Sequence, residues 1–552
     1  MSNLSQQKRA EMLAYLNRLK EIHTDDESRI ALEKIETALT EKKYGLVWEK
    51  HEEEVDKKLV HHIPVFREVK EKKIVGDNTD DFNFLLEGDN LHSLKLLEKT
   101  HKGKIDVIYI DPPYNRGKND FIYDDNYIVK EDGYRHSKWL SFMNERLVIA
   151  QKLLSVKGVI FISIDDNEQA QLKLLCDEIF DERNFIGCIC RATGTTTGQD
   201  ANKIGSSLDY CLAYSNTNEF ILKGIPLNKK DLKRFKDKDE KGFYSTLQLR
   251  KTGNEDRKED RPNMFYPVKG PDGTDIFPFG PTNYLSRWRI AESTYKELLN
   301  KNMIVWKKKK TNKIVVDGYE KSEWIPYVKY YATGRTKKVS NLFQDIDGNK
   351  KASLELKSII GTEDKFDYPK PVEFIKILLQ IASENDSVIL DFFAGSGTTG
   401  QAVMQLNKED GGKRKYILCT NNENNICEKI TYQRMKNIQE ELPHNLKYYK
   451  TEFIPKLSED EEILSSKLLD HIKEMVELEN MCEIDGVSRR IILSDEDLNA
   501  ALYEMEERGV LYIPSFILLT NEIKDSIEER KLGVVTIPDY YFTEELREVN
   551  EL

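Results

Sequence analysis

Residues 105–115 read IDVIYIDPPYN. The apolar and β-branched run from 105 to 110 has the pattern of a buried strand. Two prolines at 112 and 113 then end the strand, because proline has no N–H group to donate to a neighbour. The stretch therefore predicts a strand that delivers a carboxylate, Asp111, and an aromatic ring, Tyr114, to one point.

Strand and helix patterns alternate around this stretch, which is typical of a parallel sheet with helices on both faces. We predict an α/β fold on this basis. The expected strands lie within residues 83–90, 158–164, 387–391 and 414–420, and the expected helices within 91–99, 141–154 and 167–180.

The alternation fails between residues 191 and 360, where basic and aromatic residues interleave in WKKKKTNK and WIPYVKYYATGRTKK. We interpret this part as an inserted domain within the sheet-forming chain. The predicted regions are a helical N-terminal part (1–60), two halves of the sheet domain (61–190 and 361–445), the insert (191–360) and a mixed, acidic C-terminal region (446–552).

Composition is that of a soluble globular protein, with 33% charged and 39% hydrophobic residues. No apolar run reaches membrane-spanning length and the N-terminus lacks a signal-peptide core, so we expect a cytoplasmic protein that contacts no membrane. The seven cysteines are scattered, and we interpret them as reduced thiols. The close pair Cys188 and Cys190 lacks a second pair at zinc spacing, and no metal is expected.

Charge is distributed unevenly along the chain, whose net charge is −12. Residues 451–552 contain 26 acidic and 10 basic residues, whereas 301–340 contain 11 basic and 3 acidic ones. A local positive patch matters more to a polyanion than the total does. The insert is therefore the candidate nucleic-acid surface, although a run such as 307–310 could be only a solvated face.

A second stretch, VILDFFAGSGTTGQAV at residues 388–403, predicts a strand, a glycine turn and the start of a helix. Glycine lets the backbone turn sharply and approach a ligand closely. Such turns lie at the carboxyl ends of the strands, where α/β sheets bind ligands. Taken alone, the stretch could equally be a tight strand-to-helix turn.

Together, DPPY and FAGSG resemble the amino-methyltransferases of DNA, which use S-adenosylmethionine. The order of the two motifs, with an insert between them, resembles the circularly permuted β group. The resemblance implies a Rossmann-like methyltransferase sheet, no metal in methyl transfer, and a target-recognition domain in the insert. The implied donor-binding residues of the glycine turn are Asp391, Phe393, Ala394, Gly395, Ser396, Gly397, Thr398 and Thr399, the two threonines being helix caps on the other interpretation.

Shorter segments extend this resemblance. EGDN (87–90) is similar to an acidic turn that contacts the donor, although Asp89 could simply stabilise the turn. YPKP (368–371) implies that Lys370 lies near the donor's methionine carboxylate, the alternative being a surface lysine. LDYCLAYS (208–215) resembles a strand of the target-base pocket. Glu423 follows the strand YILCT, where an acidic residue could bind ribose hydroxyls, but the run NNENN leaves its register open.

The N-terminal YLNRLKEIH, the extended DPPYNRGKNDFIYDDNY and SIDDNEQAQLKLLCDEIF resemble the modification subunits of type III restriction-modification systems. Such subunits methylate adenine at N6 and supply DNA recognition to a separate ATP-dependent restriction subunit. Double-stranded DNA and that subunit are thus the implied partners. The acidic C-terminal region is expected to pack on the core, to form a homodimer or to bind the restriction subunit.

The resemblance also assigns roles to the opening residues. Asp111 and the carbonyl of Pro112 accept the two N–H bonds of the target amine, which frees its lone pair for attack. Pro112 and Pro113 fix φ and so hold that carbonyl still. Tyr114 stacks on the flipped-out base. Asp111 could instead be only a turn cap.

The implied DNA-binding residues lie in the insert, with aromatic neighbours that favour a nucleic-acid surface. They are Lys307, Lys308, Lys309, Lys310, Arg335, Lys337 and Lys338. Three alternatives to an adenine methyltransferase stay open: a cytosine-N4 enzyme of the same fold, a recognition subunit without catalysis, and an RNA or protein methyltransferase. Aspartate at position 111 favours adenine as a family-level tendency.

Overall fold

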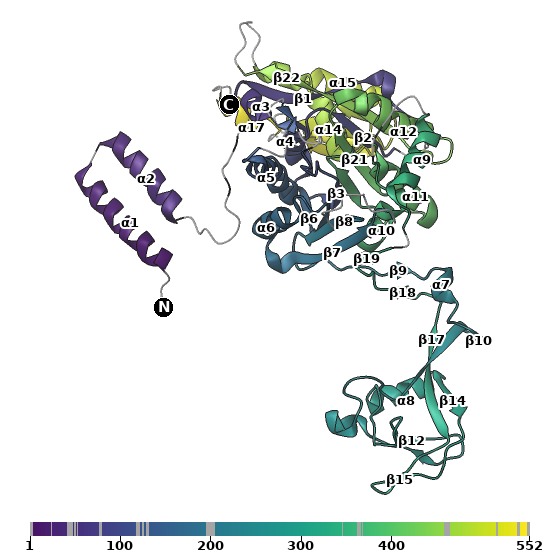
Figure 1. The fold of residues 1–552 in the computed structure, drawn as a ribbon. Coiled ribbons are helices and arrows are strands. Elements are labelled where there is room, and N and C mark those ends of the chain that lie inside the picture. Colours follow the sequence, from purple (N-terminus) through teal and green to yellow (C-terminus); the bar gives the residue numbers. More distant parts are fainter. Residues whose placement is uncertain are drawn as a thin grey trace. The chain divides into compact units, whose positions relative to one another are not determined.

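The computed structural model describes residues 4–23, 25–40, 48, 51, 53–76, 80–117, 122–123, 126–127, 132–194, 205–344, 346–361, 366, 368–456, 464–514, 517–537 and 541–548. The chain divides into two compact units (Figure 1). The first contains residues 1–222 and 340–552, and the second contains 223–339. The second unit lies inside the insert predicted from 191 to 360.

Ten strands among the described residues form the main sheet of the first unit. In spatial order they are β1 (His62–Glu68), β22 (Leu446–Pro455), β2 (Asn83–Glu87), β21 (Lys415–Thr420), β20 (Val388–Asp391), β3 (Ile105–Ile110), β6 (Leu154–Ile164), β8 (Leu208–Ser215), β7 (Phe185–Ala192) and β19 (Leu342–Phe343). The strands from β22 to β6 run parallel. β8 is antiparallel to both of its neighbours, and β1 is antiparallel to β22.

Chain order and spatial order differ at the centre of this sheet. β20 and β21 come late in the sequence, yet they lie between the early strands β2 and β3. From β20 the chain continues outward to β21, and from β3 it continues outward to β6 on the other side. The predicted α/β, Rossmann-like and circularly permuted sheet is therefore confirmed. The point of reversal between β20 and β3 is where such sheets bind ligands.

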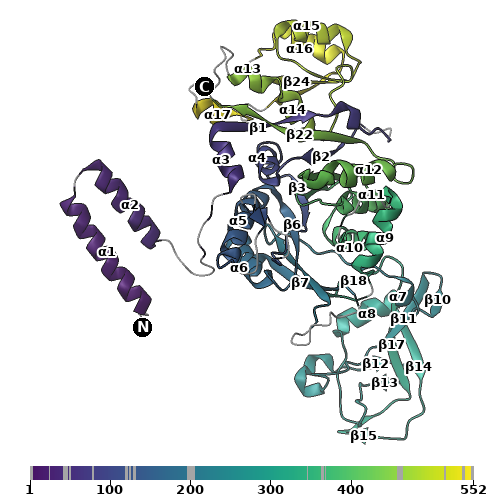
Figure 2. The same cartoon turned by 45° about the horizontal axis from the view of Figure 1, so that its top comes forward.

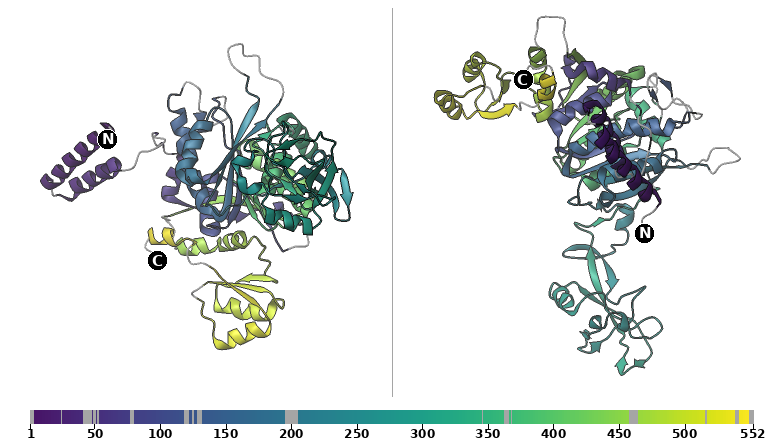
Figure 3. Two further views of the ribbon diagram at one scale, coloured as in Figure 1. Left: turned by 90° about the horizontal axis from the view of Figure 1, so that it is seen from below. Right: turned by 90° about the vertical axis from the view of Figure 1, so that its left-hand side faces the viewer.

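Helices cover both faces of the sheet, as Figures 1 and 3 show. One face carries α4 (Asn90–His101), α5 (Arg135–Leu153) and α6 (Gln169–Phe180), and the other carries α9 (Asn349–Ile360), α10 (Val372–Ala382), α11 (Thr398–Asp410) and α12 (Tyr432–Asn437). The central strands are apolar on both faces because both are covered. Ile108, Leu390 and Ile417, one from each of three adjacent strands, are fully buried.

The N-terminal part forms the expected helical hairpin, with α1 (Leu4–Ile22) and α2 (Asp26–Thr40) joined by an ion pair of 2.6 Å between Lys20 and Glu36. Residues 41–47, which were also expected to be helical, lie outside the described residues. The next helix is α3 (Glu54–His61), and a short antiparallel pair, β4 (Ile122–Tyr123) and β5 (Asn126–Tyr127), follows the DPPY turn.

The second unit has its own sheet, with β10 (Asp237–Asp239), β11 (Gly242–Gln248), β17 (Trp324–Tyr331) and β14 (Ile304–Lys308) side by side. Its core contains Leu249, Tyr266, Trp288 and Val328. The remaining elements are α7 (Lys229–Leu232), α8 (Glu292–Asn300) and the paired strands β9 (Ile225–Pro226) with β18 (Thr336–Lys337), β12 (Val268–Lys269) with β13 (Asp275–Ile276), and β15 (Val315–Val316) with β16 (Tyr319–Glu320).

The region after residue 445 contains both strands and helices. Its first ten residues form β22 inside the main sheet, and a separate parallel sheet follows from β23 (Arg489–Ile491), β24 (Val510–Pro514) and β25 (Gly533–Ile537). Figure 2 shows α15 and α16 beside β24. The helices are α13 (Leu464–Leu469), α14 (Ile472–Asn480), α15 (Asp495–Glu504), α16 (Asn521–Glu529) and α17 (Thr543–Glu548).

All seven cysteines are free thiols, as expected. Within the described ranges, no helix is both long and apolar enough to cross a bilayer.

Candidate active site

The two strands that end in the DPPY turn and the glycine turn are neighbours in the sheet. Leu390 of β20 pairs with Ile108 of β3, so the DPPY turn and the glycine turn leave the same edge of the sheet side by side. Both turns lie where the strand order reverses. This geometry places the carboxylate of Asp111 next to a glycine turn of the kind that lets a ligand approach the backbone closely.

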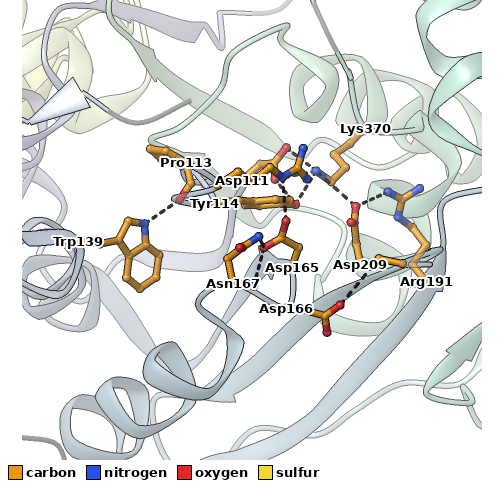
Figure 4. Close-up of polar contacts among 12 residues, drawn as sticks. Asp111, Pro113, Tyr114, Trp139, Asp165, Asp166, Asn167, Arg191, Asp209 and Lys370 are labelled. Carbon is orange, nitrogen blue, oxygen red and sulfur yellow. Dashed lines mark hydrogen bonds and ion pairs between the residues drawn. The ribbon is translucent and has the colours of Figure 1, made fainter. Parts of the chain in front are cut away.

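Asp111 is the centre of a short polar network (Figure 4). Lys370 Nζ donates to both of its carboxylate oxygens at 2.7 Å. Tyr114 donates its hydroxyl to Oδ1 of the same group at 2.8 Å, and Lys370 Nζ lies 2.7 Å from that hydroxyl oxygen. The side chain of Lys370 is only 6% exposed, while that of Asp111 is 27% exposed. The carboxylate is therefore more accessible to a ligand than the ammonium group of the lysine.

A second carboxylate stands behind the lysine. Asp209 Oδ2 lies 3.9 Å from Lys370 Nζ and accepts a hydrogen bond of 2.7 Å from the buried Arg191. Arg191 also donates to Asn349 at 2.8 Å. Figure 4 shows this row of charges running from Asp111 through Lys370 to Arg191. One ammonium group thus faces two carboxylates on two different strand ends.

A cleft of about 450 Å³ opens over these residues. Its volume lies within the usual range for small-molecule sites. Apolar and aromatic groups form part of its wall, with polar side chains between them. The lining includes Asp111, Pro112, Pro113, Tyr114, Arg116, Leu208, Asp209, Phe366, Tyr368 and Lys370.

The DPPY turn is held from behind by hydrogen bonds. Trp139 donates its indole N–H to the carbonyl of Pro113 at 2.7 Å, which leaves the carbonyl of Pro112 as the candidate second acceptor for an amine. Asn115 has the positive φ of 55° and donates to Glu168 at 2.5 Å. His136 Nδ1 lies 2.6 Å from the same carboxyl oxygen. Burial raises the pKa of Glu168 to about 8, with smaller opposing effects from Asn115 and Arg135.

This buried carboxyl group makes a pH dependence testable. Between its ordinary pKa of 4.5 and the folded value of about 8, the folded chain keeps a proton that the unfolded chain has lost. Its contribution to stability is full below pH 4.5 and is lost as the pH rises, at up to about 1.4 kcal/mol per pH unit. We expect Glu168→Gln to remove this slope, so the wild type should lose about 2–4 kcal/mol relative to the variant between pH 5 and 8. Urea denaturation at several pH values measures the free energy of unfolding of both proteins. If the two free energies changed with pH in parallel, the prediction would be wrong.

The glycine turn has the backbone that its sequence predicts. Gly395 and Gly397 have φ of 48° and 73°, and a Cβ added to Gly395 would lie 3.0 Å from the ring of Phe366. Asp391 is buried and accepts hydrogen bonds from the N–H of Phe393 at 3.0 Å and the hydroxyl of Thr399 at 2.5 Å. Burial raises the pKa of Asp391 to about 7, against the effect of these two donors.

The remaining polar groups of the turn point into the protein. Thr398 lies 3.0 Å from the hydroxyl of Ser396 and accepts from the buried Arg434 at 2.8 Å. The N–H of Ala394 donates to the carbonyl of Cys419 on β21. Gly397 is the residue before α11, and neither threonine caps that helix through its side chain. Contact of Thr398 and Thr399 with a donor stays a prediction.

Asp89 has the local role that the alternative interpretation gives it, since it caps α4 by accepting from the N–H of Leu91 at 2.7 Å. It is also close to the glycine turn, because its neighbour Asn90 donates to the carbonyl of Phe392 at 3.0 Å. Arg146 on α5 donates to Asn90 and is fully buried. Glu423 is exposed in a short 3₁₀ turn after β21. Donor contact by Asp89 and Glu423 stays a prediction.

Lys370 contacts Asp111, and Tyr114 is only 7% exposed, with the charges of Arg116 and Lys370 each 4.9 Å from its ring centroid. Contact of Lys370 with the donor and of Tyr114 with a base stays a prediction. The sequence interpretation passed over Trp139, Arg191 and Asp209. Asp209 carried a usable signal, since an acidic residue stands inside the apolar strand LDYCLAYS.

The predicted DNA-binding residues all belong to the second unit, where they form two groups. One group is at the end of β14, beside Trp324 at the start of β17, and the other follows Tyr331 at the far end of β17. Lys307 and Lys308 end β14, where Lys307 lies 4.8 Å from the ring centroid of Tyr327 and Lys308 pairs with Glu323 at 3.5 Å. Arg335 lies 4.8 Å from the ring centroid of Tyr330, and Lys337 pairs with Asp231 at 2.6 Å. The members that are exposed are Lys307, Lys308, Lys309, Lys310, Arg335 and Lys338.

Across the described residues, His, Cys, Asp and Glu side chains form no group of three or more that could hold a metal ion.

Comparison with known proteins gives one family match, to the DNA methylase family model, over residues 105–433. The StyLTI Mod subunit of a Salmonella typhimurium type III restriction-modification enzyme is 32% identical over 67% of this chain and 58% of its own length. The EcoPI Mod subunit of Escherichia phage P1 is 31% identical over 62% and 58%. The type II methyltransferase M.KpnI of Klebsiella pneumoniae is 35% identical over 66% of this chain and 90% of its length. The matched part thus spans somewhat more than half of these two Mod subunits.

Proposed function

Since this chain belongs to the DNA methylase family, whose model spans its residues 105–433, we propose that it methylates N6 of adenine in duplex DNA, with S-adenosylmethionine as donor. The observation that carries the proposal is the pairing of β3 with β20. It brings the Asp111 carboxylate, which lines the cleft, and the Gly395 turn to the same edge of the sheet.

The chain's own groups suit an aromatic amine as substrate. The lone pair of such an amine is delocalised into the ring, and acceptors for its two N–H bonds return that pair to the nitrogen. Asp111 supplies one acceptor and the Pro112 carbonyl the other, held by the proline ring and by the Trp139 bond to the next carbonyl. Fixed acceptors of this kind lower the barrier electrostatically, because they need no reorganisation during the reaction. A base must leave the duplex to reach them.

The residues at the glycine turn fit a donor that lies against backbone. Gly395 and Phe393 are partly exposed at the end of β20, and Asp89 and Asn90 of the adjoining turn are also partly exposed. Positive φ at Gly395 and Gly397 holds the turn in a shape that residues with a Cβ rarely adopt. When bound there, a sulfonium donor supplies an already activated methyl group. Asp391 holds the turn by accepting from Phe393 and Thr399.

The relatives support the finer assignment. Two are Mod subunits of type III restriction-modification enzymes. We therefore propose a modification and recognition subunit that acts in the cytoplasm, with the second unit as its target-recognition domain. A homodimer and an ATP-dependent restriction subunit are its proposed partners. The basic residues at the end of β14 and along β18 are the proposed phosphate contacts.

The test is single-molecule sequencing of DNA from cells that express this protein alone. We expect N6-methyladenine in one short motif. If N4-methylcytosine were the sole product, the target base would be cytosine and not adenine. Unmodified DNA would contradict the enzymatic proposal. RNA and duplex DNA offered in competition to the purified protein separate the nucleic-acid substrates.

The phosphate contacts can be tested by salt dependence. Each phosphate neutralised by a lysine adds about 0.9 to the slope of log K against log salt. We expect the double variant Lys309→Ala and Lys310→Ala to lower that slope by about 2 for every duplex, without changing the sequence read. Lys296→Ala is the matched control, because this exposed lysine of the same unit pairs with Glu292 on α8. Equal slopes in wild type and double variant would exclude these two residues as phosphate contacts.

A further inference from the structure

The ammonium group of Lys370 lies where the proposed reaction requires the amine of the base. It donates to both oxygens of Asp111 and lies 2.7 Å from the hydroxyl of Tyr114. A substrate amine needs the same carboxylate oxygens. With three contacts of 2.7 Å already made there, the lysine and the amine cannot occupy this position together.

An alternative place for the ammonium is present one step away. Asp209 Oδ2 is 3.9 Å from Lys370 Nζ, and the side chain of Asp209 is only 9% exposed. Asp209 keeps Arg191 as its partner at 2.7 Å, so its carboxylate is held in position whichever way the lysine turns. When the Lys370 ammonium leaves Asp111, the second carboxylate stabilises it, so that it does not become an unpaired charge in this nearly buried setting.

Resting on the proposed function, we propose that Lys370 is an internal occupant of the amine position. Its ammonium neutralises Asp111 in the free enzyme and moves to Asp209 when the amine of the target base arrives. The same movement takes a charge away from the ring of Tyr114, whose centroid lies 4.9 Å from Lys370 Nζ. When Lys370 moves away, Asp111 loses the two hydrogen bonds that the ammonium donates to it. Only another group that donates hydrogen bonds can replace them. The exchange therefore selects bases with an exocyclic amine at the correct position.

Lys370 then competes with the substrate amine for Asp111. Binding measurements on duplexes with and without that amine measure this competition. Two duplexes carry the recognition site found by sequencing, one with the target adenine and one with purine, which lacks the amino group. Both are titrated with S-adenosylhomocysteine present, so that no turnover occurs. The dissociation constant of the purine duplex divided by that of the adenine duplex measures how much the amine contributes to binding affinity. Effects on duplex pairing and on phosphate contacts cancel when this ratio is compared between proteins.

Lys370→Met removes the competitor, and we expect the ratio to rise about five-fold or more, the usual lower size of such a coupling. Lys370→Arg is the matched variant of opposite sign. A guanidinium binds a carboxylate through two parallel hydrogen bonds and is harder to displace, so the ratio should fall towards one. Because the two variants shift the ratio in opposite directions, a general loss of packing cannot imitate the result. If Lys370→Met fails to fold, the fall in Lys370→Arg decides alone.

The competing role for Lys370 is contact with the donor's carboxylate. In that case Lys370→Met would weaken S-adenosylhomocysteine binding about ten-fold or more and leave the ratio unchanged, which would overturn the proposal. The proposal for Lys370 is also overturned if the wild type methylates DNA but has the same ratio of dissociation constants as both variants. A wild type that leaves DNA unmodified overturns the proposed function itself, so the two failures are distinct.

Discussion

Asp111→Ala is expected to lower kcat for methyl transfer about 1,000-fold, since loss of one fixed electrostatic group costs about 10²–10³. Without the carboxylate, the amine keeps its lone pair in the ring. The affinity for the donor should stay within about two-fold, because the glycine turn is built on β20 and not on β3. Single-turnover methylation of a duplex with the recognition site measures the rate, and calorimetry with S-adenosylhomocysteine measures donor binding.

A matched control is Asp386→Ala. Asp386 is an exposed carboxylate just before β20, at the amino ends of the strands and thus at the opposite edge of the same sheet. Its removal changes net charge equally and should leave the rate within about two-fold, as surface substitutions usually do. Asp111→Ala with wild-type turnover would remove the carboxylate from the mechanism and return it to the role of a turn cap.

The parts of the site that the sequence predicts are those written in short, local patterns. A run of β-branched residues that ends in Asp-Pro-Pro specifies a strand and its end, and Gly395 and Gly397 specify a turn that few other residues allow. The resemblance implies one site for donor and target amine, and the pairing of Leu390 with Ile108 brings the two strand ends together.

The parts that the sequence did not reveal depend on side chains that meet across long separations. Lys370 and Asp111 stand 259 positions apart in the sequence. No local pattern near either residue indicates that the ammonium group contacts the Asp111 carboxylate. Trp139 reads as an ordinary apolar residue just before a predicted helix, because its bond to the Pro113 carbonyl depends on how α5 lies against the DPPY turn. Such choices are made by packing and partial charges in three dimensions, which periodicity does not encode.

The acidic C-terminal region was the least explained part, and one residue shows how it joins the core. Lys447 on β22 is fully buried and reaches three carboxylates, Glu477 at 2.8 Å, Glu68 at 3.0 Å and Glu483 at 3.7 Å. Glu477 on α14 is also fully buried, and it accepts the hydroxyl of Tyr449 and, at 2.7 Å, the N–H of Ile484. Two acidic residues of this region, together with Glu68 of β1, thus surround a cation of the main sheet, a pattern that a charge count along the sequence cannot show.

Lys447→Met is expected to lower the free energy of unfolding by about 3–5 kcal/mol, the usual cost of removing one partner of a buried ion pair. The methionine fills the volume but leaves Glu477 with Lys473 at 3.7 Å as its other cation. Denaturant unfolding followed by tryptophan fluorescence measures the change. The control is Lys450→Met on the same strand, whose lysine is 46% exposed and pairs with Glu87 at 3.0 Å, and which should cost no more than about 1 kcal/mol.

The cause of that loss can be separated from lost packing. If the uncompensated charge of Glu477 is responsible, adding Glu477→Gln to Lys447→Met removes the charge and should recover part of the stability, so that the double variant is more stable than Lys447→Met alone. If lost contacts of the lysine stem were responsible, the second substitution would add its own cost instead. A double variant less stable than Lys447→Met would therefore show that β22 and α14 are joined by packing and not by this buried charge.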